Sequence, residues 1–297
     1  MTKTLSGVIA AVATPIDERG APDLKRATDL ARHLLDNGCD GLNVLGSTGE
    51  ATSFARDERM AVMDAYKANG LPLDRLMVGT GAASVSDAIA LTQHAARLGF
   101  AGALVLPPFY YKGVTDDGLA NYIDALVQAT ADSKLPIYLY HYPQLTGIPW
   151  HVTLIKRLRD SFPSRIVGLK DSSGDMAFAR SAAAVASDFA VFPSTEACLL
   201  DARKGEFAGC ISATANLNAD LCARAWTAGD AGALDAAVGI RKLFDGRPLV
   251  PGVKTLLAHI HGDPALARVR PPLAAVSAAD REAIVGGYDA IRAKRAA

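Results

Sequence analysis

Short apolar runs and longer amphipathic, alanine-rich segments alternate eight times between residue 7 and about residue 228. The runs have the length of buried β-strands, and the segments between them have the apolar periodicity of α-helices. Strands are expected at 8–13, 41–45, 76–79, 103–106, 137–140, 166–170, 190–192 and 209–212. Helices are expected at 23–37, 55–69, 84–98, 115–131, 150–160, 175–187, 196–204 and 217–227. This spacing favours a parallel sheet, and eight units favour a (β/α)8 TIM barrel over an open doubly wound sheet.

A weak internal repeat supports this count. Segments 36–42, 97–103 and 203–210 each end a helix on one glycine and enter a strand on a second glycine. The first glycine suits a left-handed helix cap, and the second permits close packing where the strand begins. The first glycines are Gly38, Gly99 and Gly205, and the second are Gly41, Gly102 and Gly209.

Three further helical segments, without strands between them, are expected at 230–245, 251–261 and 277–292. The sequence therefore predicts a catalytic barrel over residues 1–228 and a C-terminal helical extension over residues 229–297. The extension is expected to pack beside the barrel or between subunits.

Charge and cysteine content limit the class of protein. Lysine plus arginine and aspartate plus glutamate both number 31, so no charge excess points to nucleic acid or an acidic membrane. The longest apolar runs are too short to span a bilayer, and the run at 8–13 makes a poor signal peptide. The four scattered cysteines contain no C-x-x-C pair, which favours reduced core thiols over disulfides or a metal site. These features predict a soluble, cytoplasmic protein.

The expected strand at 166–170 ends in Lys170, and a buried ammonium is costly unless it is paired or neutral. The ordinary interpretation is that Lys170 reaches solvent or pairs with Asp171. The alternative is a Schiff-base lysine, whose amine is kept neutral so that it can attack a carbonyl. Keeping a free lysine amine neutral at pH 7 costs roughly 4–5 kcal/mol. The surrounding site must supply that free energy.

Active sites of (β/α)8 barrels lie at the C-terminal ends of the strands, so the residues just past each strand are informative. The loop 46–50 after the second strand reads Gly-Ser-Thr-Gly-Glu and opens toward a helix. Its hydroxyls and small residues suit a carboxylate or phosphate, and the lack of a P-loop lysine favours a small carboxylate. A hydroxyl-capped turn is an equally good explanation of this loop alone.

Other rim motifs are weaker. The turn 79–84 resembles a truncated dinucleotide fingerprint, but it lacks the third glycine, and Ser84 suits a helix N-cap. Tyr140 ends the fifth strand, where a phenol can relay protons, whereas Tyr138 and Tyr142 are interpreted as packing residues. Alternation along the strand turns His141 away from the face of Tyr140. His259 and His261 match no metal-ligand spacing.

In order and spacing, the motifs Gly46-Ser47-Thr48-Gly49-Glu50, Tyr140-His141-Tyr142-Pro143 and Gly168-Leu169-Lys170-Asp171 resemble the dihydrodipicolinate synthase / N-acetylneuraminate lyase family. The resemblance implies a class I aldolase-type lyase in which Lys170 forms a Schiff base with pyruvate or a related 2-oxo acid, without metal or cofactor. It implies roles for three groups of residues: catalysis by Lys170, Tyr140, Thr48 and Tyr111, carboxylate binding by Ser47, Thr48 and Gly49, and pocket lining by Ile211. Tyr111 would be lent across a subunit interface to complete a relay through Thr48. The implied assembly is a homotetramer, a dimer of dimers.

Two departures from the family bear on the second substrate, an aldehyde. Leu145 stands where the lysine-biosynthesis synthases have an arginine that grips a carboxylate. Glu196 matches one acid of the sialic acid lyases, but Thr195 and Ala213 do not match their pattern. The interpretation favoured is an aldolase or dehydratase for a 2-keto-3-deoxy sugar acid. The alternatives are 4-hydroxy-tetrahydrodipicolinate synthase, a non-catalytic barrel that binds a 2-oxo acid and, more distantly, a nicotinamide oxidoreductase.

Overall fold

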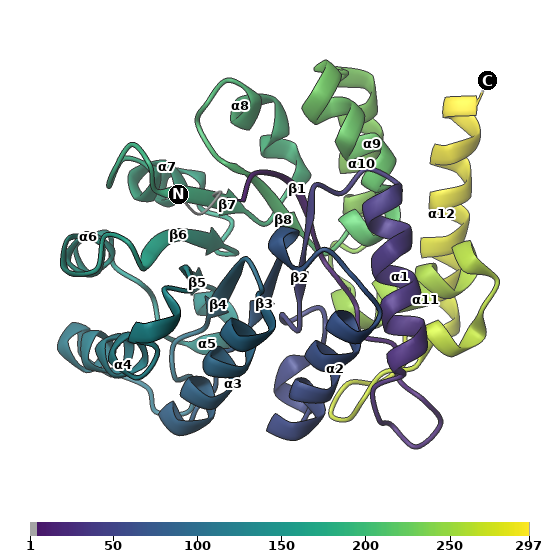
Figure 1. The fold of residues 1–297 in the computed structure, drawn as a ribbon. Helices are drawn as coiled ribbons and strands as arrows, with labels where there is room; N and C mark the ends of the chain where they lie inside the picture. The colour runs from purple at the N-terminus through teal and green to yellow at the C-terminus, as the bar shows by residue number, and fades with distance from the viewer. Residues whose placement is uncertain (1–4, 297) are drawn as a thin grey trace.

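A computed structural model describes residues 5–296 and shows one sheet of eight parallel strands that curls into a barrel (Figure 1). The strands are β1 (Gly7–Ala11), β2 (Gly41–Val44), β3 (Leu76–Gly79), β4 (Gly102–Val105), β5 (Ile137–His141), β6 (Ile166–Asp171), β7 (Ala190–Pro193) and β8 (Gly209–Ser212). Their order around the sheet is β7-β6-β5-β4-β3-β2-β1-β8. Between β7 and β8 the seam is bridged by the Ala208 N–H, which donates to the Val191 carbonyl at 3.0 Å. The expected TIM barrel is confirmed.

Helices connect the strands and cover the outside of the barrel (Figure 1). They are α1 (Leu24–Asp36), α2 (Arg56–Ala68), α3 (Val85–Leu98), α4 (Asp116–Ala129), α6 (Val152–Ser161), α7 (Met176–Ala183), α8 (Leu199–Arg203) and α9 (Ala215–Ala228). Short 3₁₀ turns lie at η1 (Ala51–Ser53), η2 (Leu73–Arg75), η3 (Ala131–Ser133) and η4 (Glu196–Cys198). Side-chain caps begin several helices; Ser84 Oγ, for example, accepts from the Asp87 N–H at the start of α3.

The structure differs from the expected elements at a few places. β1 ends at Ala11, and α7 is shorter than the expected helix at 175–187. The expected helix at 196–204 is divided into η4 and α8, because the Thr195 hydroxyl caps a 3₁₀ turn first. A short helix, α5 (Pro143–Thr146), follows β5 where a loop was expected. Proline suits its first turn, and Gly147 ends it in the left-handed conformation.

The C-terminal residues form α10 (Ala231–Lys242), α11 (Leu249–His261), η5 (Pro264–Ala267) and α12 (Ala278–Ala296). Helices α10 and α11 pack against α9, and α12 packs against α10 and α11 (Figure 1). The four cysteines are unpaired and buried. Among residues 5–296, no helix combines the length and the apolar character needed to cross a bilayer.

Residues along β5 alternate between two cores, as the two-residue period of a strand requires. Leu139 points outward into the core between strands and helices, whereas Tyr138 and Tyr140 lie inside the barrel. Inside the barrel they pack with side chains such as Met77 and Phe192. Tyr138 fills the N-terminal end of the interior and Tyr140 the C-terminal end.

The glycine repeat has the predicted function at both positions. Gly99 ends α3 with φ 93°, the left-handed conformation that glycine adopts without strain. At the start of β4, a Cβ on Gly102 would lie 2.7 Å from Cε2 of Tyr138. The second glycine therefore makes room for the Tyr138 ring inside the barrel.

We expect Gly168→Ala to lower the free energy of unfolding by about 1–3 kcal/mol, the range for an overpacked core. A Cβ there would lie 2.3 Å from the Ala190 carbonyl oxygen and 2.7 Å from Cδ1 of Tyr138. The matched control is Gly286→Ala in α12, where a Cβ meets nothing within 4 Å and alanine favours the helix. Urea denaturation of both variants measures the difference. Equal stabilities of the two variants would contradict the packing argument.

Candidate active site

Lys170 and Tyr140 are register partners on neighbouring strands, so both side chains enter the barrel at the same level. Lys170 is 3% exposed, and its Nζ lies 4.3 Å from the centroid of the Tyr140 ring. Asp171 faces the outer side, where its Oδ1 accepts from the Ser173 N–H at 2.9 Å. Among residues 5–296, Lys170 forms no ion pair within 4 Å. Pairing with Asp171 therefore does not explain this buried lysine.

Two hydroxyl groups approach the Tyr140 phenol, from the loops after β2 and β6. Ser47 Oγ lies 3.3 Å from the Tyr140 hydroxyl, and the Ser172 hydroxyl donates to it at 3.4 Å. The Trp150 indole N–H donates to the Tyr140 carbonyl at 3.1 Å and holds the end of β5. Ser172 was not predicted from the sequence, although a hydroxyl two residues after the strand-end lysine is a usable signal.

The loop 46–50 presents Ser47 and Thr48 to the cavity that contains Lys170. Among residues 5–296, no acceptor is found for the backbone N–H groups of Ser47 and Thr48, so both can bind an anion. Helix α2 begins only at Arg56 and does not follow the loop directly. The backbone amides of Ser47 and Thr48, and not the N-terminus of α2, therefore suit a carboxylate. Gly49 lies behind the loop: a Cβ there would be 3.0 Å from the Val12 carbonyl oxygen.

A buried ion pair holds this loop against the C-terminal helices. Glu50 has left-handed backbone (φ 55°), and its Oε1 accepts from Nζ of Lys254, on α11. Nζ of Lys254 also donates to the Thr14 carbonyl at 3.0 Å, and the Arg270 N–H donates to Glu50 Oε2 at 2.7 Å. Burial lowers the pKa of Lys254, while Glu50 opposes this shift.

The cavity around Lys170 has a volume of about 600 Å³. The expected residues that line it are Ser47, Thr48, Tyr140, Leu145, Lys170 and Ile211. The C-terminal segment adds Arg241, Pro248–Pro251, Pro272 and Leu273, so residues beyond the eighth unit complete the site. Tyr142, interpreted from sequence as a packing residue, also lines the cavity, and burial raises its pKa.

Three expected residues do not line this cavity. Tyr111 is 75% exposed and packs edge-on against Tyr110, with ring centroids 5.2 Å apart. Gly49 lies behind the loop, as described above. Glu196 is fully buried behind the wall, where its Oε1 accepts hydrogen bonds from the hydroxyls of Ser212, at 2.8 Å, and Thr214.

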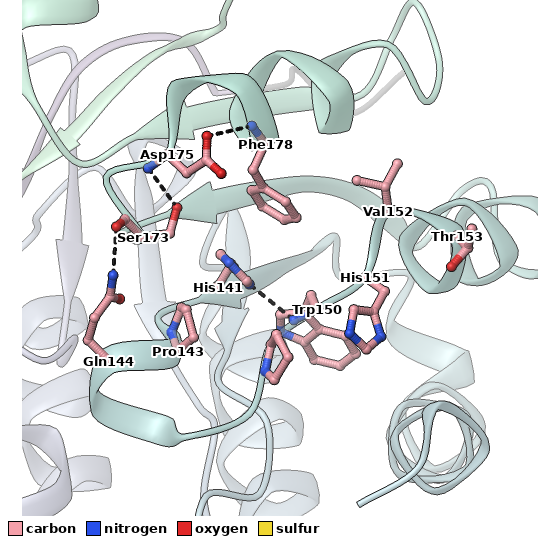
Figure 2. Close-up of a pocket in the computed structure, with 11 residues that line it drawn as sticks. His141, Pro143, Gln144, Trp150, His151, Val152, Thr153, Ser173, Asp175 and Phe178 are labelled. Carbon is pink, nitrogen blue, oxygen red and sulfur yellow. Dashed lines mark hydrogen bonds between the residues drawn. The ribbon is translucent and has the colours of Figure 1, made fainter. Parts of the chain in front are cut away.

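His141 lies on the outer face of β5, as strand alternation predicts. Figure 2 shows its imidazole in a separate surface pocket, near Trp150 and Phe178. Nδ1 accepts from the Trp150 N–H at 3.0 Å, and the ring stacks on Phe178 with centroids 4.1 Å apart. Burial lowers the pKa of His141 to about 4. This neutral histidine supports the end of β5 from outside the barrel.

Comparison with known proteins identifies the family. Residues 4–287 match the Dihydrodipicolinate synthetase family. The chain is 32% identical over 294 residues to an uncharacterized DapA-like lyase from Chloroflexus aurantiacus, with 97% of each chain covered. A dihydrodipicolinate synthase structure from Agrobacterium tumefaciens has TM-score 0.90 and 31% identity, and covers 96% of this chain and 99% of that one. The E. coli K12 prophage protein YagE, in complex with pyruvate, has TM-score 0.87 and 26% identity, covering 98% and 99%.

The TIM barrel fold and these matches define the class of protein as a class I aldolase-type lyase. The protein belongs to the Dihydrodipicolinate synthetase family and is a lyase of that class.

The pKa of His141 predicts a pH dependence of stability. The unfolded chain binds a proton near pH 6.5 and the folded one only near pH 4, so stability is full above pH 6.5 and falls as the pH drops toward 4. Between pH 7 and pH 5 we expect His141 to account for a loss of about 1–2 kcal/mol. His141→Asn keeps an acceptor for the Trp150 N–H and removes the titration. Urea denaturation at both pH values should show a smaller loss for the variant, and equal losses would contradict the assignment.

Proposed function

We propose that Lys170 forms a Schiff base with pyruvate, or with the pyruvyl unit of a longer 2-oxo acid, and that the protein thereby makes or breaks a carbon–carbon bond. The observation that carries this proposal is the position of Lys170: it is buried against Tyr140, it lines the cavity, and among residues 5–296 it has no ion-pair partner within 4 Å. Such a lysine is costly as a structural residue and useful as a nucleophile.

The chemistry follows from the positions of the side chains. The Lys170 amine attacks the ketone carbon, the carbinolamine loses water, and the iminium draws electrons from the neighbouring carbon to give an enamine. Tyr140 would carry protons to and from the reacting oxygens, with its phenol oriented by Ser47 and Ser172. The hydroxyls and amides of Ser47 and Thr48 would hold the carboxylate of the 2-oxo acid. None of these steps requires a metal or organic cofactor.

For the second part of the substrate we favour a 2-keto-3-deoxy sugar acid. Leu145 is 64% exposed at the rim of the cavity and offers no guanidinium to a carboxylate on that side. The main alternative, 4-hydroxy-tetrahydrodipicolinate synthase, predicts condensation of pyruvate with aspartate semialdehyde, and that assay distinguishes the two. Turnover of either substrate would exclude a non-catalytic binding barrel.

We also propose that Tyr111 acts across a subunit interface in a homotetramer, completing a proton relay through Thr48. The support is the exposed pair of Tyr110 and Tyr111, aromatic side chains that a second subunit could cover. Location in the cytoplasm stays a prediction from the cysteine pattern.

Borohydride reduction in the presence of pyruvate, followed by peptide mass spectrometry, tests the nucleophile. We expect a reduced adduct on Lys170, because reduction converts an iminium into a stable amine. Lys170→Ala should lose the adduct, whereas the control Lys156→Ala, a change at a surface lysine that pairs with Asp160, should keep it. An adduct on any other residue would overturn the assignment.

Exchange of the pyruvate methyl protons in deuterated water, followed by nuclear magnetic resonance, tests Tyr140 without knowledge of the second substrate. We expect Tyr140→Phe to slow exchange by about 10²–10⁴-fold, the range for a lost proton-transfer group. Tyr138→Phe is the matched control, because Tyr138 lies at the other end of the barrel interior. Wild-type exchange in Tyr140→Phe would show that another group moves the proton.

A further inference from the structure

Arg241 places a guanidinium in the cavity that contains Lys170. It lies in the last turn of α10, lines the cavity and is 29% exposed. Among the described residues that line the cavity, Lys170 and Arg241 have basic side chains, and Glu50 has a carboxylate. Because Glu50 is already paired with Lys254, the guanidinium of Arg241 gives the cavity an affinity for an anion.

The surroundings of Arg241 orient its guanidinium without using all of its donors. Nη1 lies 3.5 Å from Glu196 Oε2 and donates to the Ser212 hydroxyl at 3.4 Å. Among residues 5–296, no hydrogen bond reaches Glu196 Oε2, so the contact with Arg241 is a long ion pair. Within the same residues, Nε and Nη2 of Arg241 have no hydrogen-bond partner. The N–H groups of Nε and Nη2 lie on one edge of the guanidinium and suit a carboxylate in bidentate geometry.

The position of Glu196 beside Arg241 is fixed by its own hydrogen bonds. It is fully buried, and three donors, from Ser212, Thr214 and Asn218, converge on its Oε1. These contacts fix the orientation of the carboxylate and leave Oε2 to face the guanidinium. A buried carboxylate that is satisfied on one oxygen and turned toward a cavity cation acts as an anchor for that cation.

We infer that Arg241 binds a carboxylate at the distal end of the substrate, so that the preferred substrates are 2-oxo acids with a second, terminal carboxylate. One carboxylate is bound by Ser47 and Thr48, the ketone lies at Lys170, and the other carboxylate meets Arg241. Arg241 is a specificity-determining binding residue, and Glu196 is a positioning residue that acts through it. This inference rests on the proposed Schiff-base function and specifies its substrate class.

Paired probes that differ only at the distal end test the inference. Borohydride trapping on Lys170 is titrated with 2-oxoadipate against 2-oxohexanoate, and with 2-oxoglutarate against 2-oxopentanoate. We expect wild-type protein to be half-trapped by at least one diacid at a concentration about tenfold or more below that of its matched monoacid, as one charge-assisted contact supplies. Equal concentrations within both pairs would overturn the inference.

Variants then assign the preference to one side chain. Arg241→Gln should abolish most of the diacid preference, and Arg241→Lys should keep a part of it, because the charge remains without the bidentate fork. Arg247→Gln is the matched control: Arg247 is similarly exposed, pairs with Asp280 and does not line the cavity, so the preference should persist. An unchanged preference in Arg241→Gln would refute the role of Arg241. If that variant does not fold, the double variant Arg241→Gln/Glu196→Gln removes the uncompensated carboxylate as well.

A ligand without a ketone separates this inference from the proposed function. Glutarate should raise the Tm of the wild-type protein more than pentanoate does, and Arg241→Gln should remove the difference. Trapping of pyruvate without any diacid preference would refute the Arg241 site and leave the Schiff base standing. Absence of any adduct, together with an Arg241-dependent effect of glutarate, would refute the Schiff base and support the anion site. Equal Tm shifts by glutarate and pentanoate in the wild-type protein would overturn the Arg241 site.

Discussion

The buried ion pair between Glu50 and Lys254 joins the two parts of the molecule that form the site. Breaking a buried pair by removing one partner is costly, because it leaves an uncompensated charge in the interior. Here the pair holds the loop that presents Ser47 and Thr48 against α11, whose first residues line the same cavity. The left-handed backbone of Glu50 is maintained in the same way, since its carboxylate is held from two sides. The C-terminal helices thus determine the shape of the site.

The parallel barrel brings together residues that are distant in the chain, because all eight strands end at one rim. The hydroxyl groups of Ser47 and Ser172 both lie within hydrogen-bonding distance of the Tyr140 phenol, although the three residues come from three different β/α units. Lys170 lies beside this ring of polar groups, buried against the Tyr140 ring, in a cavity that Ile211 also lines. Under the proposed function, Ser47 and Thr48 would bind the carboxylate of the 2-oxo acid on one side of this cavity, and Lys170 and Tyr140 would act on its ketone.

Most of the fold could be predicted, because strand and helix periodicity are local and the glycines mark the junctions. The position of Lys170 and Tyr140 at the rim of the barrel was predictable for a related reason, because a polar residue at the end of an apolar strand must lie at the rim. His141 followed from alternation alone. Tyr142 was not predictable, because the backbone turns after β5 and the two-residue period no longer applies. Arg241 carried no local signal, since an arginine in the last turn of a helix is common on protein surfaces.

The sequence by itself determined the order and number of the β/α units and the face of each strand that points inward, since these depend on residue spacing along the chain. It also determined which side chains are chemically able to act at the rim. Only the tertiary structure decided which of these side chains share a cavity and which cations remain available in it. The physical reason is that packing and charge pairing are contacts between distant segments: Glu50 finds Lys254, and Glu196 finds Arg241, only after the C-terminal helices have docked on the barrel.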